Sequence, residues 1–248
     1  MGEGVRGTGT GRGGLRTSAE RALRGLLWDK VPRNHRQDPR PFLVRRVVTG
    51  VFVVIGAVVL GWSLQIEAGD STFYVATLVL ASIWTIGAFA SGPLYLGRIA
   101  HPERHDDLRR PVVGAIVLGL LLAGIFVVGA LVVREIPLVD RQISSVLSHA
   151  NAGVTPMLVL ITVVNGIAEE LFFRGALYAA VPRHPVAVST VAYVVATLAT
   201  GNFMLAFAAI LLGVVTGLER RASGGVLAPV LTHVTWSTVM LFALPLLF

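Results

Sequence analysis

The sequence contains no cysteine, a single lysine and few charged residues of any kind. Without cysteine the chain has no disulfide, no thiolate metal ligand and no cysteine nucleophile. Only 14% of its 248 residues are charged, whereas 54% are hydrophobic. Several apolar runs reach the roughly 20 residues that a helix needs to cross the hydrocarbon core of a bilayer. These features predict an all-α, polytopic transmembrane helical bundle.

We expect about seven spans, organised in three parts. Residues 1–43 form a basic, largely disordered N-terminal arm, residues 44–152 contain the first transmembrane helices, and residues 153–248 contain the remaining core. The fifth and sixth segments are the least distinct, because only Gly201 and Asn202 separate them. The predicted segments are 47–64, 73–92, 112–133, 156–181, 186–200, 203–218 and 226–247.

Arginine, which supplies almost all of the positive charge, gives the expected orientation. The net charge is +7, and eleven of the 21 basic residues precede Val47. Since basic loops stay in the cytoplasm, we place the N-terminus and the 96–110 loop inside. The 66–72 and 134–151 loops and Phe248 are then outside. Topology accounts for this distribution better than nucleic-acid binding does. We expect a bacterial plasma-membrane protein in contact with lipid, and no nucleic-acid partner.

Two short features outside the spans carry further expectations. Within the arm, residues 18–30 group their apolar side chains beside basic ones and are predicted to form a short helix at an anionic membrane surface, unless they fray as a tail. His149 and His184 fall in predicted loops, and we expect both to be solvated.

The fourth apolar segment carries charges where a membrane helix tolerates few. Glu169, Glu170 and Arg174 follow one another in AEELFFRG, and a charge at bilayer depth costs roughly 2.5–3.5 kcal/mol on insertion scales. Glu170 and Arg174 are four residues apart and share a helix face, so an intrahelical ion pair is expected. Glu169 points about 100° away. It is therefore either an unpaired general base or a carboxylate satisfied by Asn165, one turn earlier.

Three predicted helices place polar groups at one depth. Glu170, Thr197 and His233 each lie twelve residues from a predicted cytoplasmic marker, about 18 Å along the helix axis. Converging ionisable groups inside a bundle are typical of a functional site. Taken singly, His233 is explained equally well by a hydrogen bond to a neighbouring helix. The hydroxyls of Thr197 and Ser237 are of a kind that commonly bonds between membrane helices.

AEELFFRG resembles the Glu-Glu-x-x-x-Arg signature of the CAAX prenyl endopeptidase and bacteriocin-processing (CPBP) intramembrane protease family. SGGVLAPVLTH, with Gly213 and Gly217 before it, is similar to the stretch before that family's last histidine. The resemblance covers about residues 156–241. It implies that Glu169 activates water, that Glu170 and Arg174 form a structural pair, and that His233 supports the oxyanion. The implied activity is cleavage of a membrane-associated peptide or protein near the cytoplasmic face.

Two positions depart from the family pattern. Thr197 stands where a Phe-x-x-x-His motif ends in histidine, and Ser237 stands where asparagine or aspartate is expected. Threonine cannot exchange a proton near neutral pH, so the alternative is a catalytically inactive member that acts as a membrane binding or immunity-type protein. We expect no cofactor, and a divalent metal enters only through the resemblance. Bacteria generally lack prenylated CAAX substrates, and the absence of internal repeats disfavours a proton-coupled transporter.

Overall fold

The computed structural model describes residues 11–33, 35, 37–100 and 107–248, with the side chains of 11–17 excepted. Its regular structure is almost entirely helical, and the strands β1 (Ile99–Ala100) and β2 (Leu108–Arg109) pair over two residues each. The helices are α1 (Gly11–Leu27), α2 (Pro39–Ser63), α3 (Thr72–Ala90), α4 (Val112–Val133), α5 (Pro137–Ala152), α6 (Thr155–Glu170), the π-helix η1 (Leu171–Leu177), α7 (Tyr178–Ala180), α8 (Pro185–Leu198), α9 (Phe203–Ser223), α10 (Leu227–Ala243) and the 3₁₀ turn η2 (Leu244–Leu246).

The predicted all-α transmembrane bundle is confirmed. Six helical stretches within the described residues are long and apolar enough to cross a membrane, and α6, η1 and α7 together form one of them, Thr155–Ala180. The fifth predicted segment corresponds to α8, whose 14 residues span only about 21 Å. Helix α8 is flanked by α2 and α9, and about seven spans describe the bundle well.

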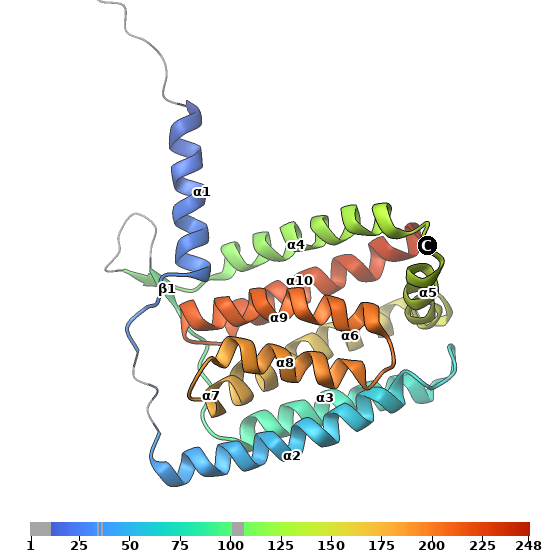
Figure 1. Ribbon diagram of the computed structural model, residues 1–248, viewed down its shortest axis with the longest axis horizontal. Helices are drawn as coiled ribbons and strands as arrows, with labels where there is room; N and C mark the ends of the chain where they lie inside the picture. Colours follow the sequence, from blue (N-terminus) through green and yellow to red (C-terminus); the bar gives the residue numbers. More distant parts are fainter. Residues whose placement is uncertain (1–10, 34, 36, 101–106) are drawn as a thin grey trace, which may run out of the picture.

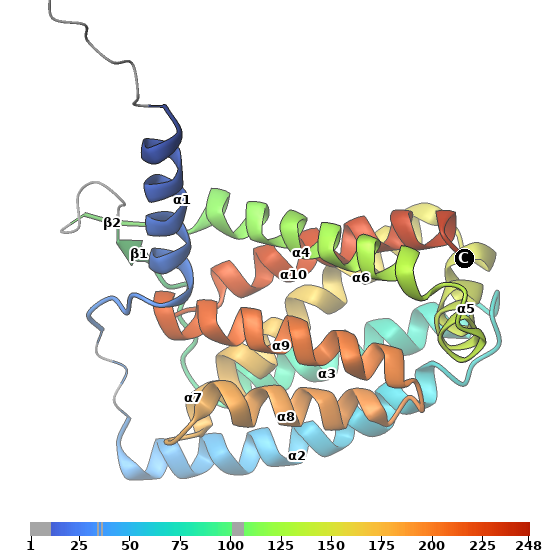
Figure 2. The same ribbon diagram turned by 45° about the horizontal axis from the view of Figure 1, so that its top comes forward.

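Successive membrane helices alternate in direction, as seven spans require (Figures 1 and 2). At one end of the bundle, the backbone N–H of Val31 after α1 donates to the carbonyl of Ala222 in α9 at 3.3 Å. At the other end, Asn202 donates through Nδ2 to the carbonyl of Gln142 in α5 at 2.6 Å. The connecting loops therefore lie at one or the other of these two ends, and the C-terminus lies at the end opposite α1 (Figure 1).

Three expectations outside the spans need correction. Disorder was expected for most of residues 1–43, yet Gly11–Leu27 is the helix α1, while residues 1–10 lie outside the described residues. The predicted 134–151 loop contains the helix α5. There, His149 is buried and its Nε2 lies 2.9 Å from the carbonyl oxygen of Ile66, so the expectation that it is solvated is wrong. His184 is exposed, as expected.

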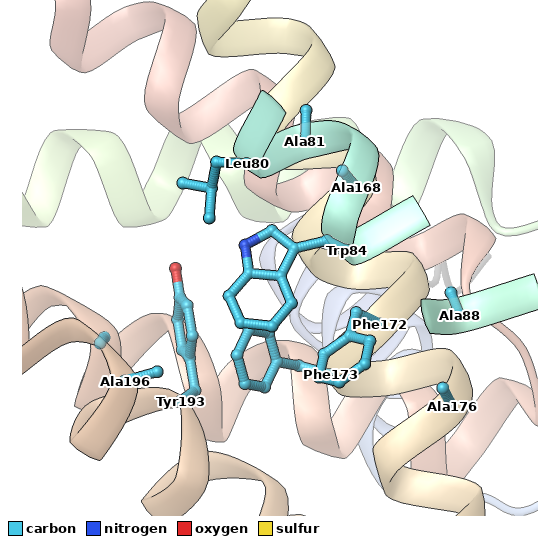
Figure 3. Close-up of a cluster of buried hydrophobic side chains, with 11 residues drawn as sticks. Leu80, Ala81, Trp84, Ala88, Ala168, Phe172, Phe173, Ala176, Tyr193 and Ala196 are labelled. Atoms are coloured by element: carbon cyan, nitrogen blue, oxygen red, sulfur yellow. The ribbon is translucent and has the colours of Figure 1, made fainter. Parts of the chain in front are cut away.

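Aromatic side chains fill the centre of the bundle (Figure 3). Trp84 of α3 is fully buried, with ring centroids 4.7 Å from Phe172 and 5.0 Å from Phe173, both in η1. Phe173 lies in turn 4.8 Å from the ring of Tyr193 in α8. Membrane helices gain little from the hydrophobic effect against each other, so this close packing provides van der Waals stabilisation. It also fixes the π-helix against α3 and α8.

Small residues let α9 and α10 take up their positions. A Cβ atom at Gly213 would lie 2.8 Å from Cγ2 of Thr190, so the glycine permits the close approach of α8 and α9. Gly225 lies even closer to the backbone of Leu96 and Gly97, which leaves no space for a Cβ atom. There the N–H groups of Val226 and Leu227 donate to the carbonyls of Tyr95 and Leu96 at 2.9 and 3.0 Å. These bonds satisfy N–H groups that a helix N-terminus leaves free, and they fix α10 in register.

The arrangement yields a topological prediction. The N-terminus and the loop from Leu96 to Arg110 should lie on the cytoplasmic side, and Phe248 should lie outside, because arginine-rich loops are retained in the cytoplasm. Alkaline phosphatase and fluorescent-protein fusions at these three positions measure the sides directly. Both termini on one side would contradict the seven-span arrangement and would mean that the short helix α8 does not cross.

Candidate active site

A buried carboxylate shared by two partners lies at the centre of the site. Oε1 of Glu170 accepts a hydrogen bond from Nη1 of Arg174 at 2.8 Å and lies 2.8 Å from Nδ1 of His233. Glu170 and Arg174 are fully buried, and His233 is nearly so. The expected ion pair is therefore present, and the contact with His233 shows that α6 and α10 bring their polar groups to the same depth.

The contact between Glu170 and His233 also defines the imidazole. With Glu170 ionised, Nδ1 must carry the proton, because a carboxylate oxygen can only accept. Nε2 is then the ring nitrogen left for another group. This carboxylate–imidazole arrangement orients the ring and fixes its tautomer, as a carboxylate does for the histidine of hydrolytic triads.

Glu169 has a partner that the sequence analysis missed. The hydroxyl of Tyr193 donates to Oε2 of Glu169 at 2.6 Å, so the carboxylate is neither unpaired nor held by Asn165. Glu169 is partly exposed, in contrast to its neighbour Glu170, and it lies within electrostatic range of His233. One signal for this contact existed: Tyr193 occupies the first position of the Phe-x-x-x-His motif, where its hydroxyl is an additional polar group.

The backbone changes from an α-helix to a π-helix directly after the two glutamates. Residues Leu171–Leu177 form this turn, and the five residues from Phe172 to Ala176 are all buried. π-turns are rare and occur frequently at functional sites. The carbonyl of Arg174 accepts a hydrogen bond from Nε of Arg220 at 2.7 Å, so a second buried arginine stabilises the turn.

The position of Arg220 corrects a prediction from the sequence. The predicted segment 203–218 leaves Arg220 in a loop, but it lies in the last turn of α9 and is only 4% exposed. Its guanidinium stacks on the ring of Tyr178, with the Cζ atom 5.0 Å from the centroid. A predicted end of the sixth segment at Leu218 hid this role, because α9 continues to Ser223.

Asn165, Thr197 and Ser237 each bond to the backbone of their own helix. Thr197 is buried, and its hydroxyl donates to the carbonyl of Tyr193 at 2.9 Å. Asn165 donates to Ile161 at 2.9 Å, and Ser237 to Val234 at 3.3 Å. The structure thus brings Glu169, Glu170, Arg174 and His233 together with Tyr193, whereas these three polar residues lie on the adjoining turns.

A third carboxylate lies buried beside this group. Oε1 of Glu219 in α9 accepts a hydrogen bond from the hydroxyl of Thr232 at 2.8 Å, directly before His233 in the chain. Glu219 is fully buried and lies within electrostatic range of Glu170 and Arg174. In the sequence, Glu219 is distinguished only by its position directly after the predicted segment 203–218, and it was not among the predicted site residues.

The side chains do not fit a metal site. Oε1 of Glu170 is already engaged by Arg174 and His233, and the Thr197 hydroxyl is turned toward its own helix. In the described part of the chain, no three histidine or acidic side chains converge as ligands for one ion. A catalytic zinc takes three protein ligands and leaves a fourth position for water, and this arrangement does not supply them.

The two adjacent glutamates should differ in their effect on stability. Glu170→Gln leaves buried Arg174 without its counter-charge, and breaking a buried pair in this way costs about 3–5 kcal/mol. Glu169→Gln keeps an oxygen that can accept from Tyr193, so the melting temperature should stay close to that of the wild type. Thermal unfolding in detergent measures both. Equal losses in the two variants would mean that the assigned surroundings of the two carboxylates are wrong.

Comparison with known proteins agrees with this constellation. Residues 151–239, which contain all of the site residues, match the family model of type II CAAX prenyl endopeptidase Rce1-like proteins. No curated protein and no solved structure matches the chain. The signature recognised in the sequence, the buried Glu-Arg-His group and the family match all fall on the same helices. The chain is thus a multi-pass membrane protein whose residues 151–239 are similar to the Rce1-like domain of type II CAAX prenyl endopeptidases, in the CPBP family.

Proposed function

We propose that the protein is an intramembrane endopeptidase in which Glu169 activates the water that cleaves a membrane-associated peptide. The observation that carries this proposal is the contrast between two consecutive glutamates. Glu170 is fully buried and held by Arg174, whereas Glu169 is partly exposed and keeps one oxygen free of the bond from Tyr193. Of these two glutamates, Glu169 is therefore the better candidate to receive a proton from a reactant.

In the proposed reaction, Oε1 of Glu169 takes a proton from water as the water oxygen attacks the peptide carbonyl carbon. The carbonyl electron pair moves to the oxygen. His233, oriented by Glu170 and entering as the imidazolium, donates a hydrogen bond from Nε2 to this oxyanion. Glu169 then gives its proton to the amide nitrogen as the C–N bond breaks, so that the products are a carboxyl end and an amine.

An apolar cavity indicates what kind of substrate the site takes. A space of about 500 Å³ lies between α4, α5, α9 and α10, and its lining includes Phe126 and Trp236. Trp236 follows His233 by one turn, and their rings lie 6.1 Å apart. An apolar peptide segment held in this cavity would reach the site from within the membrane, as expected for a membrane-associated substrate.

Activity measurements test the assignment of the base. Purified protein should cleave members of a membrane-peptide library, and Glu169→Gln should lower the rate by about 10²–10⁴, the usual contribution of a general base. Tyr193→Phe removes the hydrogen bond that orients the carboxylate and should lower the rate less. Glu67→Gln, in an exposed loop, serves as the matched control. A Glu169→Gln variant with the activity of the wild type would refute the proposal.

A non-catalytic membrane protein is the second candidate, and Thr197 is the observation that favours it. Its hydroxyl is committed to the carbonyl of Tyr193 and offers no proton acceptor to the site. The double variant Thr197→His and Ser237→Asn would restore an imidazole and an amide donor to the site. A well-placed hydrogen-bond donor to the oxyanion stabilises the transition state by about 3–4 kcal/mol. We expect this variant to cleave faster than the wild type, and we expect Glu169→Gln to abolish the gain. Full activity of the wild type would instead show that the site is complete without the histidine.

A further inference from the structure

A cavity lined by basic side chains lies at the end of the bundle that carries α1. Its volume is about 260 Å³, and among the described residues its lining includes Arg33, His35, Arg98 and Arg110 and no acidic side chain. This space corresponds to roughly eight water molecules, which leaves ample room for a phosphate group. The cavity is separate from the apolar one near His233, and the proposed reaction does not use it.

Three segments that are distant in sequence form the walls. The first follows α1 and contains Arg33 and His35, the second is the hairpin with Arg98 and Arg110, and the third is the end of α9 at Ser223 and Gly224. They are joined by backbone hydrogen bonds. Val31 donates to Ala222 at 3.3 Å and Arg98 to Ser223 at 2.9 Å.

These bonds matter for the electrostatics of the cavity. A helix C-terminus presents carbonyl oxygens, which repel an anion. Here the carbonyls of Arg220, Ala222 and Ser223 each accept a backbone N–H, so they are already satisfied. The wall built from α9 therefore opposes an anion less than a free helix end would.

Positive charge converges on this place. Nη1 of Arg110 donates a hydrogen bond to the carbonyl of Gly97 at 2.6 Å, which positions its guanidinium at the rim. His35 stacks on Tyr95 with ring centroids 3.8 Å apart. Partial burial, together with the charges of Arg220 and Arg33, lowers the pKa of His35, so at neutral pH it adds a neutral hydrogen-bonding group beside the arginines.

The cavity also lies at the level of a membrane surface. Helix α1 runs across the direction of the bundle helices, hence along the membrane plane (Figures 1 and 2). Leu26 is buried against the bundle, whereas Leu23 and Trp28 are exposed apolar groups near basic residues, which is typical of an interfacial helix. Arg33 lies in the short segment that follows this helix, so the cavity is at the depth of lipid headgroups.

We propose that this basic cavity binds the phosphate of an anionic phospholipid headgroup. Guanidinium groups match phosphate oxygens with paired hydrogen bonds, and basic pockets at the cytoplasmic ends of membrane helices commonly take anionic headgroups. Inorganic phosphate shares this chemistry but lacks the acyl chains that would lie against Leu23 and Trp28. The site does not depend on the proposed peptidase activity.

The test uses the full chain in a non-ionic detergent, titrated with dioctanoyl phosphatidylglycerol and followed by native mass spectrometry. We expect one lipid molecule to bind saturably. The double variant Arg33→Gln/Arg98→Gln should weaken its binding about 25-fold, because each arginine near an anionic surface contributes about fivefold to the affinity. Arg33→Lys/Arg98→Lys should retain more of the affinity than the glutamine pair. The matched control, Arg109→Gln/Arg183→Gln, removes the same charge from exposed positions at the same end but outside the cavity, and should leave the affinity unchanged.

Two further titrations separate the possible ligands. Dioctanoyl phosphatidylcholine should bind far more weakly than phosphatidylglycerol, and inorganic phosphate should not compete at concentrations comparable to those of the lipid. Equal losses in the cavity variant and the control variant would show unspecific attraction and overturn the proposal. Equal binding of the two lipids, or displacement of the lipid by inorganic phosphate at similar concentrations, would overturn it as well.

Discussion

The structure depends most on the carboxylate of Glu170 and the two groups that share it. An isolated charge inside a membrane bundle is strongly unfavourable, and Glu170 and Arg174 remain buried because each neutralises the other. The same oxygen holds His233 of α10, and the carbonyl of Arg174 holds Arg220 of α9. One buried ion pair thereby links the helix that carries both glutamates to the two helices that follow α8. In a solvent that cannot satisfy polar groups, these few bonds restrict how the helices slide past one another.

The proposed chemistry relies on the different surroundings of two neighbouring residues. Glu170 is enclosed and already engaged, whereas Glu169 retains access and an unused oxygen. The π-turn after them contributes to this division, because it presents Arg174 to Glu170 while Phe172 and Phe173 pack against Trp84. Positioning is thus achieved by an aromatic cluster on one side and by buried charges on the other. A similar division between an engaged and an available carboxylate is how environments separate the roles of paired acids in enzymes.

The end of the bundle that carries α1 shows a second use of polar groups. There, the turn from Leu96 to Gly97 closes against Gly225, and its carbonyls receive the first N–H groups of α10. This docking sets the height of His233 in the bundle, and the same turn forms part of the wall of the basic cavity. The position of His233 and the proposed lipid site therefore depend on one shared structural element. A residue changed in this turn would affect both.

The sequence alone determined the all-α membrane bundle, the segments that cross it and the pairing of Glu170 with Arg174. These features follow from apolar length and from helical periodicity, which are local properties of the chain. Only the tertiary structure decided that Tyr193 is the partner of Glu169, that Arg220 is buried, and that 134–151 contains a helix covering His149. Each of these depends on which helices lie side by side, and a tyrosine hydroxyl or an arginine near a predicted helix end looks the same in sequence whether it faces lipid, water or a carboxylate. Hydropathy describes how much of a segment is apolar, but the direction in which a polar group points is set by packing.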